Sequence, residues 1–235
     1  MKIAIIGISG RMGSTHLATA QEWGADIVGP DDADVVVIAS PDNTHGLYVL
    51  NHLMAGQAVF CEKPLATTLA RLESFPKGDT VALGCHLPLR QFANEFEIEG
   101  TTVDLVYDYG RKTKFLHSWR NDPDYDLVMG GGIHLMDIWM FKTGVREIEV
   151  TKTAHMTVSG EAKCPDLFMG RFVSGPYRGR LTVDFTKDGP HRHVVNQWVN
   201  EKTTDKAYQL RAFLDKPTTD TTAIAAHRAC LHFAP

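Results

Sequence analysis

The sequence of 235 residues contains few cysteines and no pattern that would use them together. Its four cysteines are Cys61, Cys85, Cys164 and Cys230, and none of them forms a C-x-x-C pair. Closely paired cysteines are what zinc sites and the disulfide frameworks of small secreted domains require, so neither is predicted. The spacing instead favours separate buried thiols in a reducing compartment, and we expect a cytoplasmic protein.

The sequence also lacks a basic excess and a long apolar run. The 24 Lys and Arg residues stand against 28 Asp and Glu residues, a formal net charge of -4 that gives no sign of a nucleic-acid partner. No apolar stretch approaches the roughly 20 residues of a membrane-spanning helix, so no membrane partner is expected. Met1-Lys2-Ile3 leads directly into a predicted strand, which leaves no room for a signal peptide. A hydrophobic content of 43% indicates a globular protein of one large or two small domains.

A glycine-rich turn follows the first predicted strand. The β-branched run at 2–6 leads into Gly7-Ile8-Ser9-Gly10-Arg11-Met12-Gly13, and residues 15–23 continue as a predicted helix. Glycines in such a turn let a pyrophosphate approach the backbone, while the N–H groups at the helix N-terminus face the anion. The order of strand, glycine turn and helix predicts a dinucleotide site, and a turn without a ligand is the alternative.

Two further motifs follow predicted strands. Ser40-Pro41-Asp42-Asn43-Thr44-His45 comes after the strand at 34–39, and Glu62-Lys63-Pro64 comes after the strand at 58–61. In an open parallel sheet, ligands bind at the carboxyl ends of the strands. Pro64 has no backbone N–H, so it ends the strand directly after the lysine. We therefore expect Lys63 at the ligand-binding edge; an ordinary solvated lysine is the alternative.

The pattern of secondary structure changes near residue 90. Before it, predicted strands alternate with helices, which indicates a doubly wound parallel sheet. These strands lie at 2–6, 25–28, 34–39, 58–61 and 80–84. After a connecting helix near 88–97, short turns join strands directly, which indicates a mostly antiparallel sheet. These strands lie at 103–109, 147–158, 167–173, 177–186 and 191–199, and helices at 204–214 and 221–231 close the chain.

The sequence thus predicts an α/β fold with two domains. Residues 1–90 are expected to form a Rossmann-like dinucleotide-binding domain. Residues 91–235 are expected to form an α+β domain with an open, mostly antiparallel sheet, used for substrate binding and oligomerisation. An open sheet leaves an apolar face, and burial of that face against another subunit makes a homo-oligomer the expected assembly.

A histidine-bearing segment begins a predicted apolar helix in the second domain. It reads Gly130-Gly131-Gly132-Ile133-His134-Leu135-Met136-Asp137. His134 and Asp137 are three residues apart and therefore share one helix face. An unperturbed histidine has a pKa of about 6.5, so it can exchange a proton near neutral pH. A helix cap beside a surface pair is the alternative.

Together these motifs resemble the Gfo/Idh/MocA family of nicotinamide-dependent oxidoreductases, named for glucose-fructose oxidoreductase and inositol dehydrogenase. The resemblance covers nearly the whole chain, since the motifs follow one another in the family's order. They are the glycine turn at 7–13, P-x-N-x-H at 41–45, E-K-P at 62–64, G-G and H-x-x-D at 131–137, and Y-Q-L-R-A-F-L at 208–214. The resemblance implies reversible hydride transfer between NAD, with NADP as the alternative, and a secondary alcohol of a sugar, polyol or nucleotide-linked sugar.

The resemblance also assigns roles to residues. Lys63 would stabilise a developing alkoxide as a cation, His134 would take up the proton, and Asp137 would orient His134 or bind a hydroxyl. The expected cofactor contacts are Gly7, Ser9, Gly10, Arg11, Met12, Gly13, Asp31, Ser40, Pro41, Asn43, His45 and Glu62. The expected substrate contacts are His86, Trp119 and Arg120. No metal is assigned, because His191 and His193 share a strand face without a carboxylate partner.

Two positions depart from the family's pattern. The family usually has Asp or Asn four residues before the catalytic histidine, where this chain has Gly130. Between Val28 and Asp34 the chain has only five residues, where a further helix and strand are usual. Within this span Asp31 or Asp32 is the expected partner of the ribose hydroxyls, which would favour NAD over NADP. A plain turn containing both aspartates is an equally good interpretation.

Two other function classes remain open. A cofactor-binding regulator, or a module with reduced catalysis, is favoured by Gly130 and by the short span at 29–33, and is opposed by Lys63 and His134. A dihydrodipicolinate-reductase-like enzyme is suggested by Gly10-Arg11-Met12-Gly13. That enzyme's K-x-x-x-P-S-G-T segment and its paired histidines are absent from this sequence, so the sugar or polyol oxidoreductase is the preferred hypothesis.

Overall fold

The computed structural model describes residues 1–76, 82–118, 120–202 and 204–233, and the chain divides into two compact units. Unit 1 contains residues 1–91 and 204–227, and unit 2 contains residues 92–203 and 228–235. The sequence predicted contiguous domains at 1–90 and 91–235, so the difference lies in the segment at 204–227. Helix α6 (Tyr208–Asp215) accounts for it, because its apolar residues join the core of the first sheet. That shared core includes Leu210, Phe213 and Leu214 with Ile3, Val37 and Phe60.

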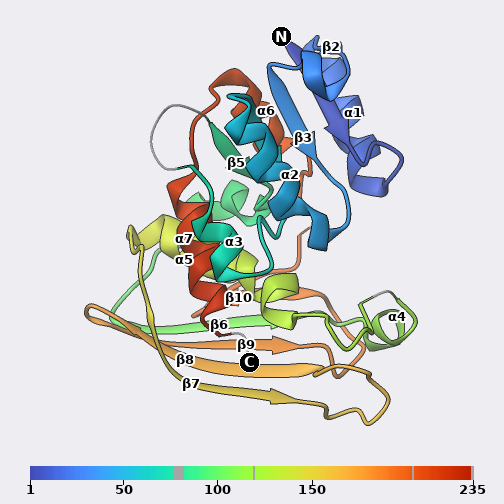
Figure 1. Ribbon diagram of the computed structural model, residues 1–235. Helices are drawn as coiled ribbons and strands as arrows, with labels where there is room; N and C mark the ends of the chain where they lie inside the picture. Colours follow the sequence, from blue (N-terminus) through green and yellow to red (C-terminus); the bar gives the residue numbers. More distant parts are fainter. Residues whose placement is uncertain (77–81, 119, 203, 234–235) are drawn as a thin grey trace. The chain divides into compact units, whose positions relative to one another are not determined.

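Unit 1 contains a five-stranded parallel sheet of order β2-β1-β3-β4-β5 (Figure 1). The strands are β1 (Lys2–Ile6), β2 (Asp26–Ile27), β3 (Val35–Ile38), β4 (Ala58–Cys61) and β5 (Leu83–Cys85). The helices between them are α1 (Arg11–Trp23), the 3-10 helix η1 (Pro30–Asp32), α2 (Asp42–Met54) and α3 (Leu69–Glu73). All four residues of β3 are buried, as expected for a central strand that is covered on both faces. The predicted doubly wound parallel sheet is confirmed.

Unit 2 contains a six-stranded sheet of order β11-β10-β6-β9-β8-β7. Its strands are β6 (Thr102–Asp108), β7 (Glu149–Met156), β8 (Leu167–Ser174), β9 (Tyr177–Asp184), β10 (Arg192–Val195) and β11 (Trp198–Asn200). Only the pairing of β6 with β9 is parallel among the pairings of these strands. The predicted open, mostly antiparallel sheet is therefore confirmed.

Two segments of unit 2 differ from the sequence prediction in detail. The single strand expected at 191–199 is a hairpin, because Asn196 has a φ of 53° and turns the chain between β10 and β11. Asparagine tolerates this left-handed conformation better than most residues. The helix expected near 88–97 is a 3-10 helix, η2 (Pro88–Glu95).

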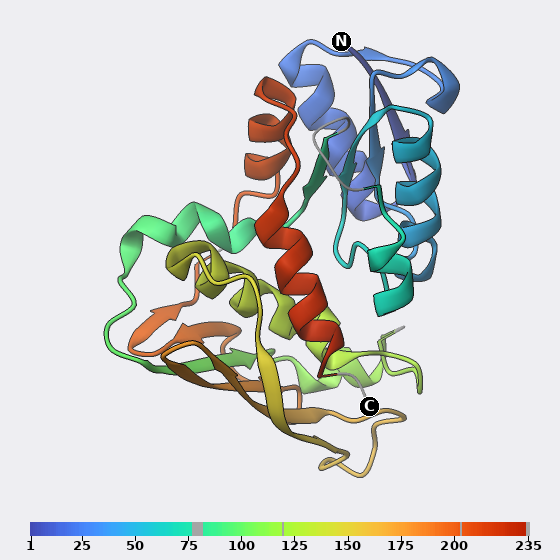
Figure 2. The same cartoon turned by 60° about the vertical axis from the view of Figure 1, so that its left-hand side comes forward.

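The helix that carries His134 lies across one face of the second sheet (Figure 2). It consists of a π-helical turn, η3 (Val128–Gly132), followed directly by α5 (Ile133–Thr143). The remaining helices are α4 (Lys112–Leu116) and α7 (Thr221–Leu231), and α7 begins in unit 1 and ends in unit 2. Within the described part of the chain, no helix has the length and apolar character needed to cross a membrane.

Candidate active site

Three sequence motifs meet at the carboxyl edge of the parallel sheet in unit 1. The last residues of β1, β3 and β4 are register partners across the sheet. The residues that follow them are Gly7, Ala39 and Glu62. The N–H groups of Ala39 and Glu62 donate to the last carbonyls of β1 and β3, at 2.9 and 2.8 Å, so the ladder continues by one row. The glycine turn, the Ser40 segment and the E-K-P motif therefore start side by side, at the edge where parallel sheets bind ligands.

The three glycines of the first turn differ in how strongly the structure requires a glycine at their position. Gly7 has a φ of +84°, and a Cβ there would lie 2.5 Å from the Ala39 carbonyl oxygen. A Cβ on Gly13 would overlap the backbone of Gly7 and Ile8, so this glycine lets α1 pack closely on the turn. Gly10 is exposed, and a Cβ there would meet only the Gly7 oxygen at 3.3 Å and the Ala39 oxygen at 3.9 Å. Gly10 is therefore the least tightly packed of the three, and a Cβ there would need only a small shift of the Gly7 carbonyl.

The N-terminus of α1 is suited to an anion. Gly10 is its N-cap residue and makes no side-chain capping hydrogen bond, and the first turn carries no acidic side chain. Ser9, Gly10 and Arg11 are exposed around it. N–H groups and the positive end of the dipole of a 13-residue helix thus face the surface at the sheet edge. These residues fit the pyrophosphate of a dinucleotide.

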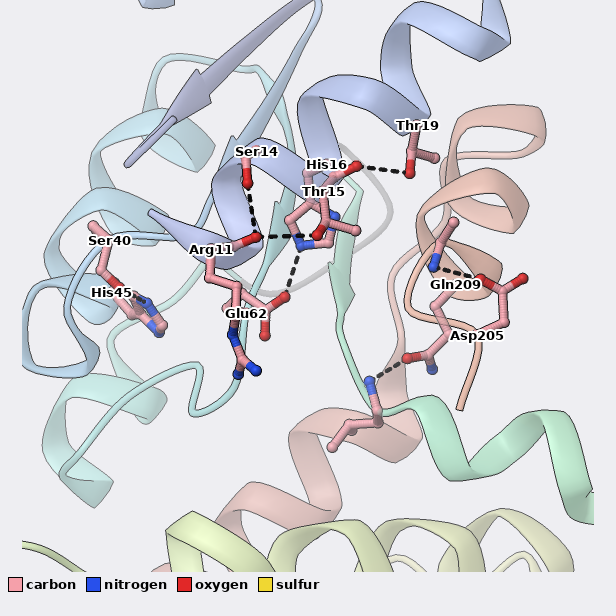
Figure 3. Close-up of polar contacts among 12 residues, drawn as sticks. Arg11, Ser14, Thr15, His16, Thr19, Ser40, His45, Glu62, Asp205 and Gln209 are labelled. Carbon is pink, nitrogen blue, oxygen red and sulfur yellow. Dashed lines mark hydrogen bonds and ion pairs between the residues drawn. The ribbon is translucent and has the colours of Figure 1, made fainter. Parts of the chain in front are cut away.

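Glu62 of the E-K-P motif is held by a buried histidine. His16 on α1 is 0% exposed, and its Nε2 lies 2.7 Å from Glu62 Oε1 (Figure 3). The His86 ring lies 5.6 Å from the His16 ring at the end of β5. Burial alone would raise the pKa of Glu62, but the charge of His86 and the hydrogen bond from His16 outweigh burial and lower that pKa. The Glu62 carboxylate is thus ionised and fixed directly before Lys63.

The same three residues have donor atoms within 4.8 Å of one another, so His16, Glu62 and His86 could surround a metal ion. They combine the ligand types that zinc accepts. In this structure Glu62 is already compensated by its hydrogen bond to His16. The sequence assigned no metal, and that assignment stays a prediction.

His45 connects two loops of the candidate site. Its ring is 1% exposed, with Nδ1 2.8 Å from the Pro64 oxygen and Nε2 2.8 Å from the Ser40 oxygen. We predicted a cofactor contact for His45, but both ring nitrogens are directed at backbone carbonyls. The ring instead ties the segment after β3 to the segment after Lys63. Pro41 and Asn43, at the start of α2, are exposed and keep their predicted role as candidate contacts.

Asp31 and Asp32 lie at the opposite edge of the sheet from the glycine turn. Gln57, directly before β4, donates to the carbonyls of Pro30 and Ala33 at 2.7 and 2.9 Å, which places η1 at the amino edge. Figure 1 shows β2 at the same end as the N-terminus. Strand β1 separates the two edges by roughly 13 Å at about 3.3 Å per residue. The structure therefore does not support the predicted contact of Asp31 with the cofactor ribose, because β2 ends at the level of Ile3.

In unit 2, His134 lies in the first turn of α5. From Leu127 to Met140 every residue is buried except Gly130 and His134, which are half-buried. Their spacing of four residues puts them on one helix face. Asp137 is 0% exposed, so a direct contact with a substrate hydroxyl is not supported, and orientation of His134 stays its predicted role.

Sequence analysis did not assign His193 and Tyr107 to the site, yet they lie beside His134. The ring of His193 is 6.2 Å from that of His134 and 5.0 Å from that of Tyr107, its register partner on β6. Burial, followed by the charge of His191, lowers the pKa of His193 to about 3, so its ring is neutral at physiological pH. The sequence signal for these residues is the placement of His191 and His193 on one strand face, a pattern that also fits a metal site.

The predicted substrate contacts have different outcomes. His86 is 5% exposed and packs against His16 and Phe60 in unit 1, so a direct substrate contact is not supported. Trp119 lies outside the described residues. Arg120 is half-buried, and its backbone N–H donates to Ser118 Oγ at 3.2 Å, which leaves its predicted role open.

Comparisons with known proteins give a consistent assignment. Residues 24–76 match the model of an oxidoreductase family with an NAD-binding Rossmann fold, GFO_IDH_MocA. Inositol 2-dehydrogenase 2 of Saccharopolyspora erythraea is 36% identical over 171 residues, covering 66% of this chain and 48% of the relative. An inositol 2-dehydrogenase of Rhodococcus erythropolis is 31% identical over 195 residues, covering 79% of this chain and 52% of the relative. The chain thus spans about half the length of the curated relatives it matches.

A solved structure agrees with the fold. The WlbA (WbpB) dehydrogenase of Thermus thermophilus, in complex with NAD and α-ketoglutarate, aligns with a TM-score of 0.73 at 19% identity. The alignment covers 99% of this chain and 94% of that chain. This structure supports the fold, while the matched family segment and the inositol dehydrogenase relatives confirm the family predicted from the sequence. The chain belongs to the Gfo/Idh/MocA family of oxidoreductases.

Proposed function

We propose that the chain is an oxidoreductase that transfers a hydride between NAD and a secondary alcohol carbon of a sugar, polyol or nucleotide-linked sugar. The observation that carries the proposal is the shared row of Gly7, Ala39 and Glu62 at the carboxyl edge of the first sheet. This row starts the uncapped glycine turn and the lysine motif side by side. A dinucleotide on the turn and a cation near its reactive end is the arrangement that hydride transfer requires.

The names of similar proteins support the substrate class. The two relatives described above are inositol 2-dehydrogenases, which are named for a polyol. Among structures of similar fold, WlbA of Thermus thermophilus was solved with NAD and UDP-GlcNAcA, a nucleotide-linked sugar. Both classes present a secondary alcohol among other hydroxyl groups.

In the proposed reaction, a bound nicotinamide supplies the hydride acceptor or donor. The chain's own residues supply charge and a proton site. A lysine ammonium is cationic at neutral pH, so Lys63 stabilises negative charge on the substrate oxygen as it develops. His134 takes up the hydroxyl proton during oxidation and returns it during reduction. Lys63 belongs to unit 1 and His134 to unit 2, and their action on one oxygen is part of the proposal.

The chain's own structure supplies the support around these two residues. His16 fixes the ionised Glu62 before Lys63, and His45 binds the Pro64 carbonyl after it. The residues on both sides of the lysine are thus held by buried histidines, Glu62 through its side chain and Pro64 through its carbonyl. Such fixed surroundings lower the cost of orienting the cation at the moment of reaction.

A binding experiment tests the proposal before any substrate is identified. Thermal unfolding is followed with NAD, NADH, NADP and NADPH in turn, because a ligand that binds only the folded chain raises the melting temperature. We expect stabilisation by NAD or NADH, followed by turnover with myo-inositol or a UDP-linked sugar. A chain that none of the four dinucleotides stabilises would contradict the proposal. Stabilisation by a dinucleotide without turnover of any such alcohol would favour the alternative function, a cofactor-binding regulator.

We further propose that the chain assembles as a homo-oligomer through the second sheet. Within unit 2, α5 covers one sheet face, while Met169 on β8 and Val199 on β11 are 42% and 52% exposed. Apolar residues exposed on a sheet are commonly buried by a second copy. Light scattering on the purified chain should give a molar mass that is a multiple of 26.0 kDa. The double variant Met169→Lys with Val199→Lys should have a lower molar mass. A monomer at all concentrations would contradict this.

We also propose a cytoplasmic location. The four cysteines are free and buried, a state that suits a reducing compartment. Burial raises the pKa of the Cys61 and Cys230 thiols, which keeps both groups protonated and unreactive. Fractionation of cells that produce the protein would test the location, and recovery outside the cytoplasm would contradict it.

A further inference from the structure

The helix start in unit 2 presents a narrow accessible strip. Gly130 and His134 are the two residues of the run from Leu127 to Met140 that are not buried, and they are one helical turn apart. Gly130 has no side chain of its own to offer beside the histidine. A ligand that reaches His134 along this strip must therefore meet whatever covers Gly130.

Tyr125 covers Gly130 with the hydroxyl end of its ring. A Cβ added to Gly130 would overlap Tyr125 Oη, and it would lie 2.6 Å from Tyr125 Cζ. The phenol thus occupies the space in which a side chain at position 130 would begin. Asp126 holds the backbone between the two, because its carboxylate accepts hydrogen bonds from Val128 and Met129 at 2.8 and 3.2 Å. The Gly130 N–H also donates to the Asp126 carbonyl at 2.8 Å.

The ring of Tyr125 is anchored from behind by other aromatic residues. Its centroid lies 6.5 Å from that of Phe115 and 6.4 Å from that of Phe185, and both phenylalanines are buried. Tyr125 itself is half-buried. An aromatic ring with an apolar body and a polar tip is a rigid hydrogen-bonding group, because few rotatable bonds must be fixed.

The next glycine has a similar relation to a second phenol. A Cβ on Gly131 would lie 2.5 Å from Tyr107 Cδ1, so this glycine lets Tyr107 pack against the helix. Tyr107 is buried, and its ring contacts those of His191 and His193, so it packs beneath the helix. Tyr125 is the phenol that lies on the accessible strip.

We propose that Tyr125 is a substrate-binding residue whose hydroxyl takes the place of the side chain that Gly130 lacks, and that it recognises a second hydroxyl of the substrate while His134 serves the reacting one. The inference rests on the proposed function and specifies its ligand as an alcohol that carries a second hydroxyl group. A phenol can both donate and accept, so it can hydrogen-bond a neutral hydroxyl in either direction. Gly130 is then a requirement for recognition and not a sign of lost activity.

The test compares the unchanged chain with Tyr125→Phe, using myo-inositol and each of its monodeoxy analogues with NAD. The unchanged chain should have a kcat/KM about 3- to 10-fold lower for at least one analogue, the worth of one hydrogen bond. Tyr125→Phe should lose the same factor on myo-inositol and show no further loss on that analogue. NADH binding should stay unchanged. Tyr177→Phe, on β9 in the same unit, is the matched control and should discriminate like the unchanged chain.

A pair of variants tests whether the Tyr125 hydroxyl takes the place of a side chain at position 130. Tyr125→Ala alone should raise the KM for myo-inositol. The addition of Gly130→Asn should lower the KM part of the way back, since the asparagine would enter the vacated space. A purely structural Tyr125 would give equal losses on all analogues and no recovery. Undiminished discrimination by Tyr125→Phe would overturn this inference alone. An unchanged chain that oxidises neither myo-inositol nor a UDP-linked sugar would overturn the proposed function and this inference with it.

Discussion

Gly10 is the glycine of the first turn whose substitution reports on ligand binding. Its φ of -78° and ψ of 162° are extended, a conformation that valine adopts without strain. Gly7 and Gly13 are fixed by close packing, so variants there would disturb the fold. Gly10 is the N-cap residue of α1, so a side chain there would stand at the helix N-terminus, where the pyrophosphate is expected.

We predict that Gly10→Val lowers the affinity for NADH at least about tenfold, which corresponds to 1.4 kcal/mol, as measured by titration calorimetry. Gly29→Val is the matched control, because Gly29 is also an extended N-cap residue and has open space around its Cβ position. The control should bind like the unchanged chain. Equal affinity of a folded Gly10→Val variant would place the dinucleotide elsewhere.

At the scale of elements, the 3-10 helix η1 determines what the two aspartates can do. It lies at the amino edge with Gln57, about 13 Å from the glycine turn along β1. Exposed charges at that separation are beyond the screening length of about 8 Å at physiological salt. Choice between NAD and NADP must therefore depend on residues at the other edge, where Arg11 is exposed.

We predict that Asp31→Asn with Asp32→Asn changes the ratio of NAD to NADP affinity by less than about twofold, because neither carboxylate reaches the ribose. Parallel calorimetric titrations with the two dinucleotides measure the ratio. Arg11→Ala is the comparison at the opposite edge and should weaken NADP more than NAD, since it removes a cation near the phosphates. A tenfold shift toward NADP in the aspartate variant would restore the original sequence prediction.

The elements show which predictions a sequence can support. Strand β4 and the ends of α7 were predicted to the residue, because β-branched runs and apolar periodicity are local signals. The position of Asp31 was missed because spacing after a glycine turn does not show at which edge a two-residue strand ends. Tyr125 was missed because its role depends on packing over a glycine five residues later, which no residue pattern encodes.

At the scale of the whole molecule, buried histidines tie stability to pH. Burial lowers the pKa of His193 in unit 2 to about 3 and that of His227 in unit 1 to about 4. Both are below the value of about 6.5 in an unfolded chain. The unfolded state therefore binds more protons below pH 6.5, and its proton uptake favours unfolding. The stabilisation is complete above about pH 6.5 and is lost as the pH falls toward the folded values.

We predict that the free energy of unfolding in urea falls by a few kcal/mol between pH 7 and pH 4.5, at up to 1.36 kcal/mol per pH unit for each histidine. His227→Leu should flatten this slope, because leucine fills the buried site without a titrating group. His117→Leu is the control at an exposed position and should keep the slope. A slope that His227→Leu leaves unchanged would assign the pH dependence to other groups.

The division into units also limits what the sequence could predict. The change from alternating strands and helices to direct strand connections located the boundary near residue 90, close to the division after Gln91. The return of 204–227 to unit 1 depends on Phe213 and Leu214 packing against Phe60 and its neighbours, a long-range contact. The sequence of an amphipathic helix shows which face is apolar but not which sheet that face will cover.

The central claim, that Lys63 and His134 act on one substrate alcohol, is tested most directly by the initial rate of NAD reduction with myo-inositol. Lys63→Met and His134→Asn should each lower kcat about 10²–10³-fold while NADH affinity stays unchanged, as expected when a charge or proton site is lost only from the transition state. Lys114→Met and His117→Asn, at exposed positions, should turn over normally. Full turnover by His134→Asn, or loss of NADH binding as the whole effect of Lys63→Met, would contradict the account.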